Sequence, residues 1–388
     1  MSNIASEYLI EGKNHQKRKY FSLAVCASIF LIAYILGADF GKFQPDYYFA
    51  HSITMSHLHR GGNFLQLLRT IPNSASGAFP LWLFGFVSGF QLHKFMSLCV
   101  FVGIVTVILR ATRLNTYGYY YLMALLLSPM MISATAWVLP EIFTMLTVVL
   151  VFMLTVKHPT SAVLLAVFVP ISRQTFIVHL AGRLFFKPKN AVAFVAMCVM
   201  ATLALGSLVY VWGGLVPPKL RGVHLTPSLK SPINALLIFS LYFAYHNVSS
   251  LKRMPLNLRK LTISIGLASI LVWIGLHQPP LLGGGYIFSR IEARSIVLSG
   301  LIEILFLTLF FYKTKFSTIM VILLASMSFI TTNYMFLKYV DFYFFAFLAY
   351  GISDINESFQ LVFTEYAQSG FVFEIFSFLA ASVFYLHH

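Results

Sequence analysis

One short segment of the chain combines residue types that acid–base chemistry requires. Residues 45–51 read Pro-Asp-Tyr-Tyr-Phe-Ala-His, and they open the longest polar stretch of the sequence. Asp and Glu together number only 12 in 388 residues, so a carboxylate beside a membrane is a rare feature here. Such a carboxylate can accept the proton of an attacking hydroxyl group. We therefore predict that Asp46 is a catalytic base and that His51, on the same segment, binds substrate.

Asp46 also has a purely structural explanation. The preceding proline suits the first position of a helix, where an acidic residue interacts favourably with the helix dipole. Asp39 is the second candidate base, although solvation at the end of an apolar run explains it more simply. His51, His57 and His59 could form a metal site with Asp46, but their spacing matches no zinc pattern. No cofactor is expected, and a divalent metal is the less favoured alternative.

Polar side chains elsewhere could hold an anionic or polar substrate. Arg173 lies in an apolar stretch, where a guanidinium group is costly unless it is paired or faces a polar cavity. Arg290 and Arg294 lie one helical turn apart, so both could contact one phosphate group. The predicted substrate-binding residues are Glu141, Arg173, Gln174, Arg290, Arg294, His51, His277 and Lys338.

Several of these residues have structural alternatives. Glu141 follows a proline and could simply begin a helix. Glu292 lies between Arg290 and Arg294, and an ion pair on a solvated face would contribute little free energy. A lone lysine such as Lys338 usually extends its charged end from an apolar surface to water. Their contacts in the folded protein must therefore separate the two explanations.

Membrane-spanning helices must position these residues. The sequence is 59% hydrophobic and 10% charged, with a mean hydropathy of +0.80, which excludes an ordinary soluble domain. Apolar windows of about 17 to 25 residues recur along the chain. The net charge of +15 arises from short basic clusters between apolar runs, which are topology signals rather than a nucleic-acid surface. We predict an all-α polytopic membrane protein with about 11 to 13 transmembrane helices and no nucleic-acid partner.

A single integral membrane domain is expected over residues 1–388. The basic clusters place residues 1–20 in the cytoplasm, residues 39–90 in a first outer loop with interface helices, and residues 91–388 in the remaining bundle. A run between 160 and 186, broken by a proline and an arginine, indicates short or re-entrant helices. Spans are expected near 21–38, 91–109, 117–136, 141–156, 190–212, 233–249, 261–277, 296–312, 317–336, 340–353 and 370–386.

The order of these motifs resembles the GT-C superfamily of membrane glycosyltransferases, which use polyprenyl-phosphate-linked sugars. In that superfamily an acidic residue opens the first outer loop ahead of interface helices, and the resemblance implies this place for Asp46. The other matching segments, in order, are Gly61-Gly62, Pro80-Leu81, Ser128-Pro129 and the segment from Ala134 to Glu141.

Three later segments resemble the dolichyl-phosphate-glucose α-1,2-glucosyltransferase branch. They are Ser172 to Val178, Trp212 to Val216 with His224 after it, and His277 to Leu282 with Tyr286 and Arg290 after it. The family pattern has two adjacent acids after the first span, and here Tyr47 takes the place of the second. The resemblance implies transfer of a hexose, glucose if the branch holds, from a polyprenyl-phosphate donor to a lipid-linked or surface glycan. The expected location is a bacterial inner membrane, with the site on the periplasmic face.

Two other functional classes are alternatives. An envelope polysaccharide polymerase of the O-antigen type also combines many spans with outward-facing arginines, but it would carry its largest outer loop late in the chain. A lipid-linked glycan flippase or transporter would show inverted repeats and ionisable residues at the bilayer midplane. The sequence contains no visible repeat, so the transporter is the least favoured class.

Overall fold

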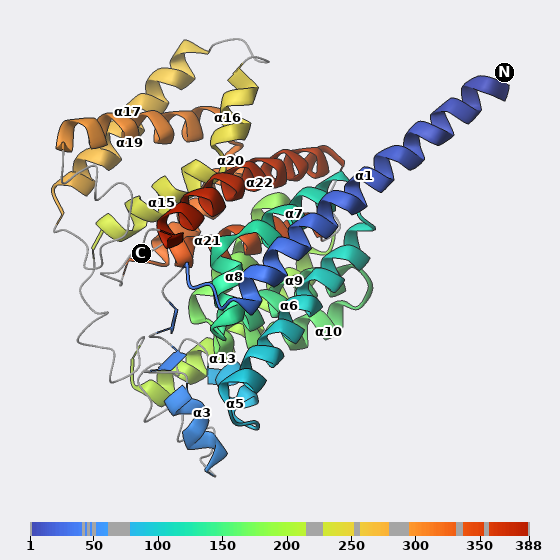
Figure 1. Cartoon of the computed structure of the whole chain (residues 1–388). Coiled ribbons are helices and arrows are strands. Elements are labelled where there is room, and N and C mark those ends of the chain that lie inside the picture. Colours follow the sequence, from blue (N-terminus) through green and yellow to red (C-terminus); the bar gives the residue numbers. More distant parts are fainter. Residues whose placement is uncertain are drawn as a thin grey trace.

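The structure is a computed structural model in which the chain forms helices and connecting turns (Figure 1). It describes residues 2–40, 43–44, 47–48, 52–60, 78–214, 228–251, 257–278, 295–330, 337–352 and 357–386. No strand occurs within these ranges. The predicted all-α class is therefore confirmed.

Six of the described helices are long and apolar enough to cross a membrane. They are Gln16–Ile35 within α1 (Ser2–Ile35), α6 (Phe90–Thr112), α13 (Ala191–Trp212), α17 (Leu258–Leu276), α19 (Ile296–Lys313), and Gln360–Val383 within α22 (Glu357–Leu386). A bent pair, α7 (Thr116–Leu127) with α8 (Pro129–Ala136), would add a seventh span. A multi-pass integral membrane protein is thus supported.

Other predicted spans are shorter helices. Apolar helices of 10–17 residues lie at Glu141–Thr155, Pro159–Ser172, Phe316–Met327 and Val340–Ile352. They belong to α9 (Glu141–Lys157), α10 (Pro159–Leu165) with α11 (Phe168–Ser172), α20 (Phe316–Met327), and α21 (Leu337–Leu348) with η6 (Ala349–Ile352). The predicted 233–249 span is divided between α15 (Lys230–Tyr242) and α16 (Ala244–Leu251). Because apolar stretches here often fold as short or bent helices, length and composition support fewer spans than the predicted count of about 11 to 13.

The last helix, α22, begins at Glu357 instead of near residue 370. Its earlier turns carry polar side chains, which made that part of the sequence look unlike a span. Neighbouring helices hold these side chains: Glu365 Oε2 lies 3.1 Å from His246 Nδ1, and the hydroxyl groups of Tyr366 and Thr318 are 3.2 Å apart. Polar partners from α16 and α20 therefore extend the helix beyond its apolar part.

α21 forms the centre of the bundle. Its residues from Val340 to Leu348 are buried, and tyrosines from neighbouring helices donate hydrogen bonds to its backbone. The Tyr121 hydroxyl donates to the carbonyl oxygen of Phe345 at 2.7 Å. On α22, Gly370 allows close approach, because an added Cβ would lie 2.5 Å from the Phe344 ring. Figure 1 shows α22 running beside α7 and α21.

Two chain breaks shape the interior. α7 and α8 meet at an angle of 59°, where Ser128 caps α8 by accepting a hydrogen bond from the Met131 N–H at 3.1 Å, and Pro129 starts the new helix. Between residues 159 and 186 the chain forms the short helices α10 and α11, then η3 (Gln174–Phe176), α12 (Ile177–Arg183) and η4 (Leu184–Phe186). The sequence predicted a pair of short or re-entrant helices here, and the structure has five short helical elements instead.

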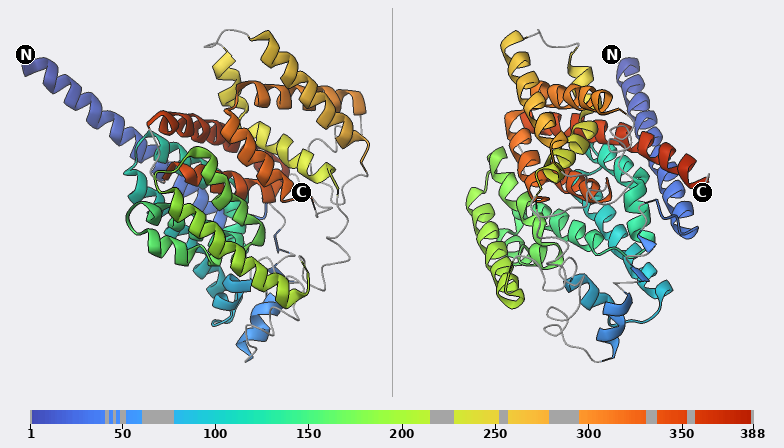
Figure 2. Two further views of the ribbon diagram at one scale, coloured as in Figure 1. Left: turned by 180° about the vertical axis from the view of Figure 1, so that it is seen from behind. Right: turned by 90° about the vertical axis from the view of Figure 1, so that its left-hand side faces the viewer.

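The two ends of the molecule differ in character. The short helices α3 (Ser52–His59) and α5 (Ala78–Phe84) lie at one end, whereas α16, α17 and the adjoining end of α19 lie toward the other (Figures 1 and 2). The N-terminal part of α1 projects away from the bundle in Figure 1 and in the left view of Figure 2. The expected interface helices of the first outer segment thus correspond to α3 and α5, which are short and lie together.

Candidate functional site

The described part of the candidate site centres on an ion pair between Arg173 and Glu141. The Nη1 atom of Arg173 lies 3.2 Å from Oε1 of Glu141, and the two side chains are 19% and 7% exposed. Glu141 is the first residue of α9, directly after Pro140. Arg173 directly follows the last residue of α11. Its backbone is extended (φ −153°, ψ 103°), so the chain turns there and the side chain can reach α9. This pairing offsets the free-energy cost that we expected for an arginine in an apolar stretch.

Four side chains in the same two segments each have a buried polar atom without a hydrogen-bonding partner among the described residues. The buried atoms are Trp137 Nε1, Thr144 Oγ1, Ser172 Oγ and Gln174 Oε1. Trp137 and Thr144 lie about one helical turn on either side of Glu141, and Ser172 and Gln174 flank Arg173. Most buried polar atoms in proteins have a partner, so their concentration around one ion pair suits the recognition of a polar ligand.

The turn before α9 carries backbone strain. Val138 has a φ of +59°, in the left-handed region that a β-branched residue rarely adopts. Such a conformation costs on the order of 1–3 kcal/mol and persists only where the surroundings hold it. Here Val138 is fully buried in an apolar cluster with Tyr47, Met55, Leu81 and Phe84. Packing therefore maintains a strained turn next to Glu141, as is common at functional sites.

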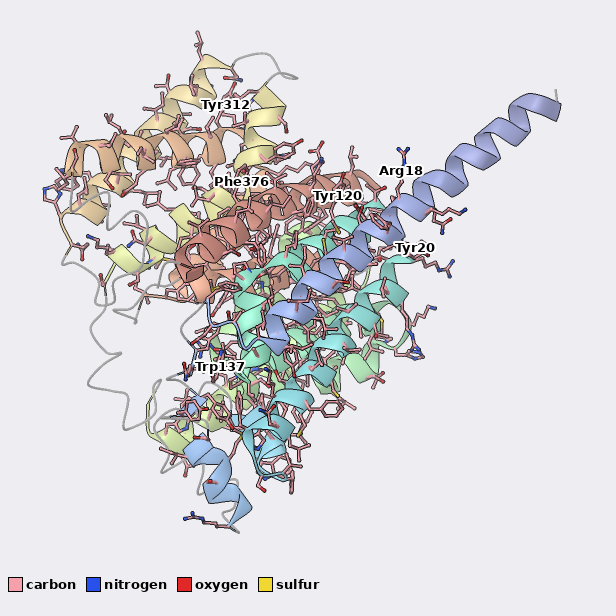
Figure 3. All side chains as sticks on the ribbon, viewed as in Figure 1. Arg18, Tyr20, Tyr120, Trp137, Tyr312 and Phe376 are labelled. Carbon is pink, nitrogen blue, oxygen red and sulfur yellow. The ribbon has the colours of Figure 1, made fainter. Side chains whose placement is uncertain are left out.

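The segment that follows Asp46 packs against this same turn. Tyr47 is buried, and its hydroxyl group lies 3.1 Å from His93 Nδ1 on α6. Burial raises the pKa of Tyr47 to about 12, so the hydroxyl stays neutral. The ring of Tyr48 lies 6.0 Å from the ring of Trp137. Figure 3 labels Trp137 close to α8, toward the end of the molecule that carries α3 and α5. The first outer segment and the start of α9 are therefore neighbours.

Tyr47, where the family pattern would have a second acid, has a packing role in this protein. Its ring makes an edge-to-face contact with Phe90, with centroids 4.9 Å apart, and its hydroxyl group forms a hydrogen bond with His93. His93 in turn places Nε2 2.8 Å from the carbonyl oxygen of Val87. These contacts attach the segment after Asp46 to the start of α6.

α21 adds a residue that the sequence interpretation missed. The Tyr343 hydroxyl donates to Thr175 Oγ1, in the segment just after Arg173. The same hydroxyl interacts electrostatically with both Arg173 and Glu141. Tyr343 is one of 20 tyrosines, and no spacing or motif sets it apart from the others. Only the convergence of α21 with η3 identifies it.

Asp39, the second candidate base, has a structural role. Its Oδ1 atom accepts a hydrogen bond from the backbone N–H of Phe43 at 2.6 Å, and its Oδ2 atom accepts one from Gln44 at 3.0 Å. A carboxylate that binds two backbone N–H groups stabilises the turn after α1. The simpler explanation of Asp39 is therefore the one that its contacts favour.

His277 has described contacts within its own helix. It is exposed, its Nδ1 atom lies 2.7 Å from the carbonyl oxygen of Trp273, and the two rings are 4.5 Å apart. These contacts do not join it to the ion pair. Five other predicted positions lie outside the described part of the chain: Asp46, His51, Arg290, Arg294 and the side chain of Lys338.

A metal site formed by Asp46 and the nearby histidines was the less favoured prediction from the sequence. Where the chain is described, no three His, Cys, Asp or Glu side chains gather as a metal ion would require. Asp46 and His51, and the side chains of His57 and His59, lie outside that part.

Comparison of the chain with protein-family models, with curated proteins and with solved structures finds no match. The geometry of the site therefore has to support a function by itself, and the resemblance to the GT-C superfamily stays a prediction.

Proposed function

We propose that this protein is a membrane glycosyltransferase of the GT-C type. It moves a hexose from a polyprenyl-phosphate donor to a lipid-linked or surface glycan. One observation carries the proposal: Glu141 and Arg173 form an ion pair, residues near both in sequence carry buried polar atoms without partners among the described residues, and Tyr47 and Tyr48 contact the turn just before Glu141. Sugars present many hydroxyl groups, and a cluster of unsatisfied donors and acceptors matches that chemistry.

The proposed reaction exchanges one bond at the anomeric carbon of the hexose. The acceptor hydroxyl oxygen bonds to this carbon, and the bond from the carbon to the phosphate oxygen breaks. Asp46 takes the proton of the acceptor hydroxyl, and the lipid phosphate leaves with the bonding electron pair. Cationic side chains stabilise the negative charge on the departing phosphate.

The ion pair of Arg173 with Glu141 favours a role in binding the sugar rather than the phosphate. Its guanidinium group already has a carboxylate partner, so the pair carries little net charge. A nearly neutral ion pair orients donors and acceptors toward sugar hydroxyls better than it attracts an anion. Arg290, Arg294 and Lys338 then remain the proposed phosphate-binding cations.

The bilayer side of the site follows from the basic clusters. They place the N-terminus in the cytoplasm and the first outer segment on the opposite face. Contacts of Tyr47 and Tyr48 with the turn before Glu141 support the same side for the proposed site, which is the face away from the cytoplasm. A bacterial inner membrane, with a periplasmic site, is the proposed location.

Transfer by purified protein in lipid vesicles tests this function. Wild-type protein supplied with polyprenyl-phosphate-glucose and a lipid-linked glycan acceptor should transfer the hexose. Asp46→Asn, which keeps the size of the side chain but removes its basicity, should lose transfer by at least about a hundredfold. Asp39→Asn is the matched control and should retain most activity. Equal transfer by Asp46→Asn and wild type would remove Asp46 from the mechanism, and no transfer by wild type would contradict the donor class.

A further inference from the structure

Two carboxyl groups meet inside the helix bundle, on a different side of α21 from the candidate site. Asp341 on α21 and Glu374 on α22 are 0% and 1% exposed. The Glu374 carboxyl lies within hydrogen-bonding reach of both Asp341 and the Tyr242 hydroxyl. Asp341 is two residues from Tyr343, so the two side chains leave the helix on roughly opposite sides. This acid pair is therefore separate from the Glu141–Arg173 ion pair.

Hydrogen-bond accounting shows that the acid pair lacks a donor. Ser128 Oγ donates to Asp341 Oδ2 at 2.5 Å, and Tyr242 Oη donates to Asp341 Oδ1 at 2.5 Å. An ionised carboxylate only accepts hydrogen bonds, so two ionised acids cannot bond to each other. The Glu374 Oε1 atom is buried and has no partner among the described residues. One proton on the pair would supply the donor that is missing.

The described surroundings of the acid pair carry no positive charge. The groups that face it are Ser128 at the bend between α7 and α8, and Tyr242 on α15. Across the described residues, no lysine, arginine or histidine interacts with either carboxyl group. Two buried carboxylates without a counter-charge are unstable through desolvation and mutual repulsion, and such pairs bind a proton instead.

We propose that Asp341 and Glu374 form a proton-binding site that holds one proton between the two carboxyl groups at neutral pH. The site goes beyond the proposed sugar transfer and shares no residue with it. Ser128 connects it to the chain break, because its hydroxyl donates to Asp341 and accepts from the Met131 N–H that starts α8. The bound proton thus lies where α8, α15, α21 and α22 meet.

The pH dependence of stability tests this site. The folded protein holds the proton, whereas an ordinary carboxyl group in the unfolded chain has released it above about pH 4. Raising the pH through the neutral range should therefore lower the folding equilibrium constant of the wild type by up to about tenfold per pH unit. Glu374→Gln replaces the proton with a permanent N–H donor. The folding equilibrium constant of this variant should therefore lack the fall of up to about tenfold per pH unit that is expected for the wild type. Thermal unfolding of the detergent-solubilised protein at several pH values measures both profiles.

Parallel profiles of wild type and Glu374→Gln would overturn the proposal. If Glu374→Gln does not fold, Asp341→Asn serves the same purpose, since it also brings an N–H donor that does not titrate. Labelling of the wild type with dicyclohexylcarbodiimide adds a readout that needs no variant, because this reagent attacks protonated carboxyl groups in apolar surroundings. Modification of Asp341 or Glu374, found by peptide mass spectrometry, is expected. Modification of other acids with both of these unmodified would also overturn the proposal.

Discussion

The Glu141–Arg173 ion pair and the Asp341–Glu374 acid pair are two buried polar clusters that differ in the sign of their charges. Opposite permanent charges lie 3.2 Å apart in the first, whereas two acids meet in the second. A buried charge must be paired or neutralised, because the surroundings solvate it poorly. The ion pair satisfies this requirement with an arginine, and we propose that the acid pair does so with a proton. The ion pair should therefore persist over a wide pH range, whereas the stability that the acid pair confers should change with pH.

Their hydrogen bonding differs as well. Close to the ion pair in sequence, Trp137, Thr144, Ser172 and Gln174 each have a buried polar atom without a partner among the described residues. In the acid pair, both oxygens of Asp341 accept hydrogen bonds from neighbouring helices, and Glu374 Oε1 is the atom that the proposed proton would satisfy. Satisfied groups hold helices together, whereas unsatisfied groups can be used by a ligand. The comparison therefore assigns recognition to the ion pair and cohesion of the bundle to the acid pair.

Breaking the ion pair should produce the largest loss of stability. Arg173→Met fills a similar volume but removes the guanidinium charge from beside Glu141. Removing one partner of a buried pair costs about 3 kcal/mol or more. The free energy of unfolding in mixed micelles measures this loss. The double variant Arg173→Met/Glu141→Gln is the control and should recover part of it, because no charge is then left without its partner; no recovery would show that the charges are not coupled.

Removing the central acceptor of the acid pair should cost somewhat less. Asp341→Ala leaves the hydroxyl groups of Ser128 and Tyr242 without their acceptor. Two buried donors without partners should lower the free energy of unfolding by about 2 to 3 kcal/mol. Asp341→Asn keeps a carbonyl acceptor in place and should lose less than half of that. Equal losses in the two variants would contradict this view of the hydrogen bonds.

These two clusters also mark what the sequence could and could not predict. The cost of a guanidinium group in an apolar run indicated that Arg173 needs a partner, and Glu141 was named for its own position. That the two form a pair was not predictable, because they lie 32 residues apart and meet only through the break after α11.

The acid pair was missed for a different reason. Asp341 and Glu374 each interrupt an apolar run, and scarce acids inside a membrane are a functional signal. That signal was applied to Asp46, where a motif supported it, and not to single acids without a motif. All-helical class and most helix positions followed from hydropathy, whereas bends such as the one at Ser128 and the early start of α22 depend on contacts between helices.

A smaller effect should follow from altering the distance between α21 and α22 near the acid pair. Gly370 lies one helical turn before Glu374, and a Cβ there would meet the buried Phe344 ring at 2.5 Å. Gly370→Ala should therefore lower the free energy of unfolding by about 1 to 2 kcal/mol through overpacking. Gly206→Ala on α13 is the matched control, since nothing lies within 4 Å of the added Cβ. A stable Gly370→Ala protein would show that α22 can shift without loss.

The central claim is that the unsatisfied polar atoms around the ion pair bind sugar, and Thr144→Val tests it most directly. Valine keeps the shape of threonine but removes the buried hydroxyl, for which the described part of the chain offers no partner. Thr308→Val is the matched control, because the Thr308 hydroxyl is also buried without a partner but lies on α19.

The measurement is the rate of hexose transfer as a function of donor concentration, together with the free energy of unfolding. Loss of one hydrogen bond to substrate should lower kcat/KM by about tenfold in Thr144→Val. Its stability should stay unchanged or rise, and Thr308→Val should match the wild type in transfer. Equal kcat/KM values for Thr144→Val and wild type would contradict the claim that this cluster recognises the sugar.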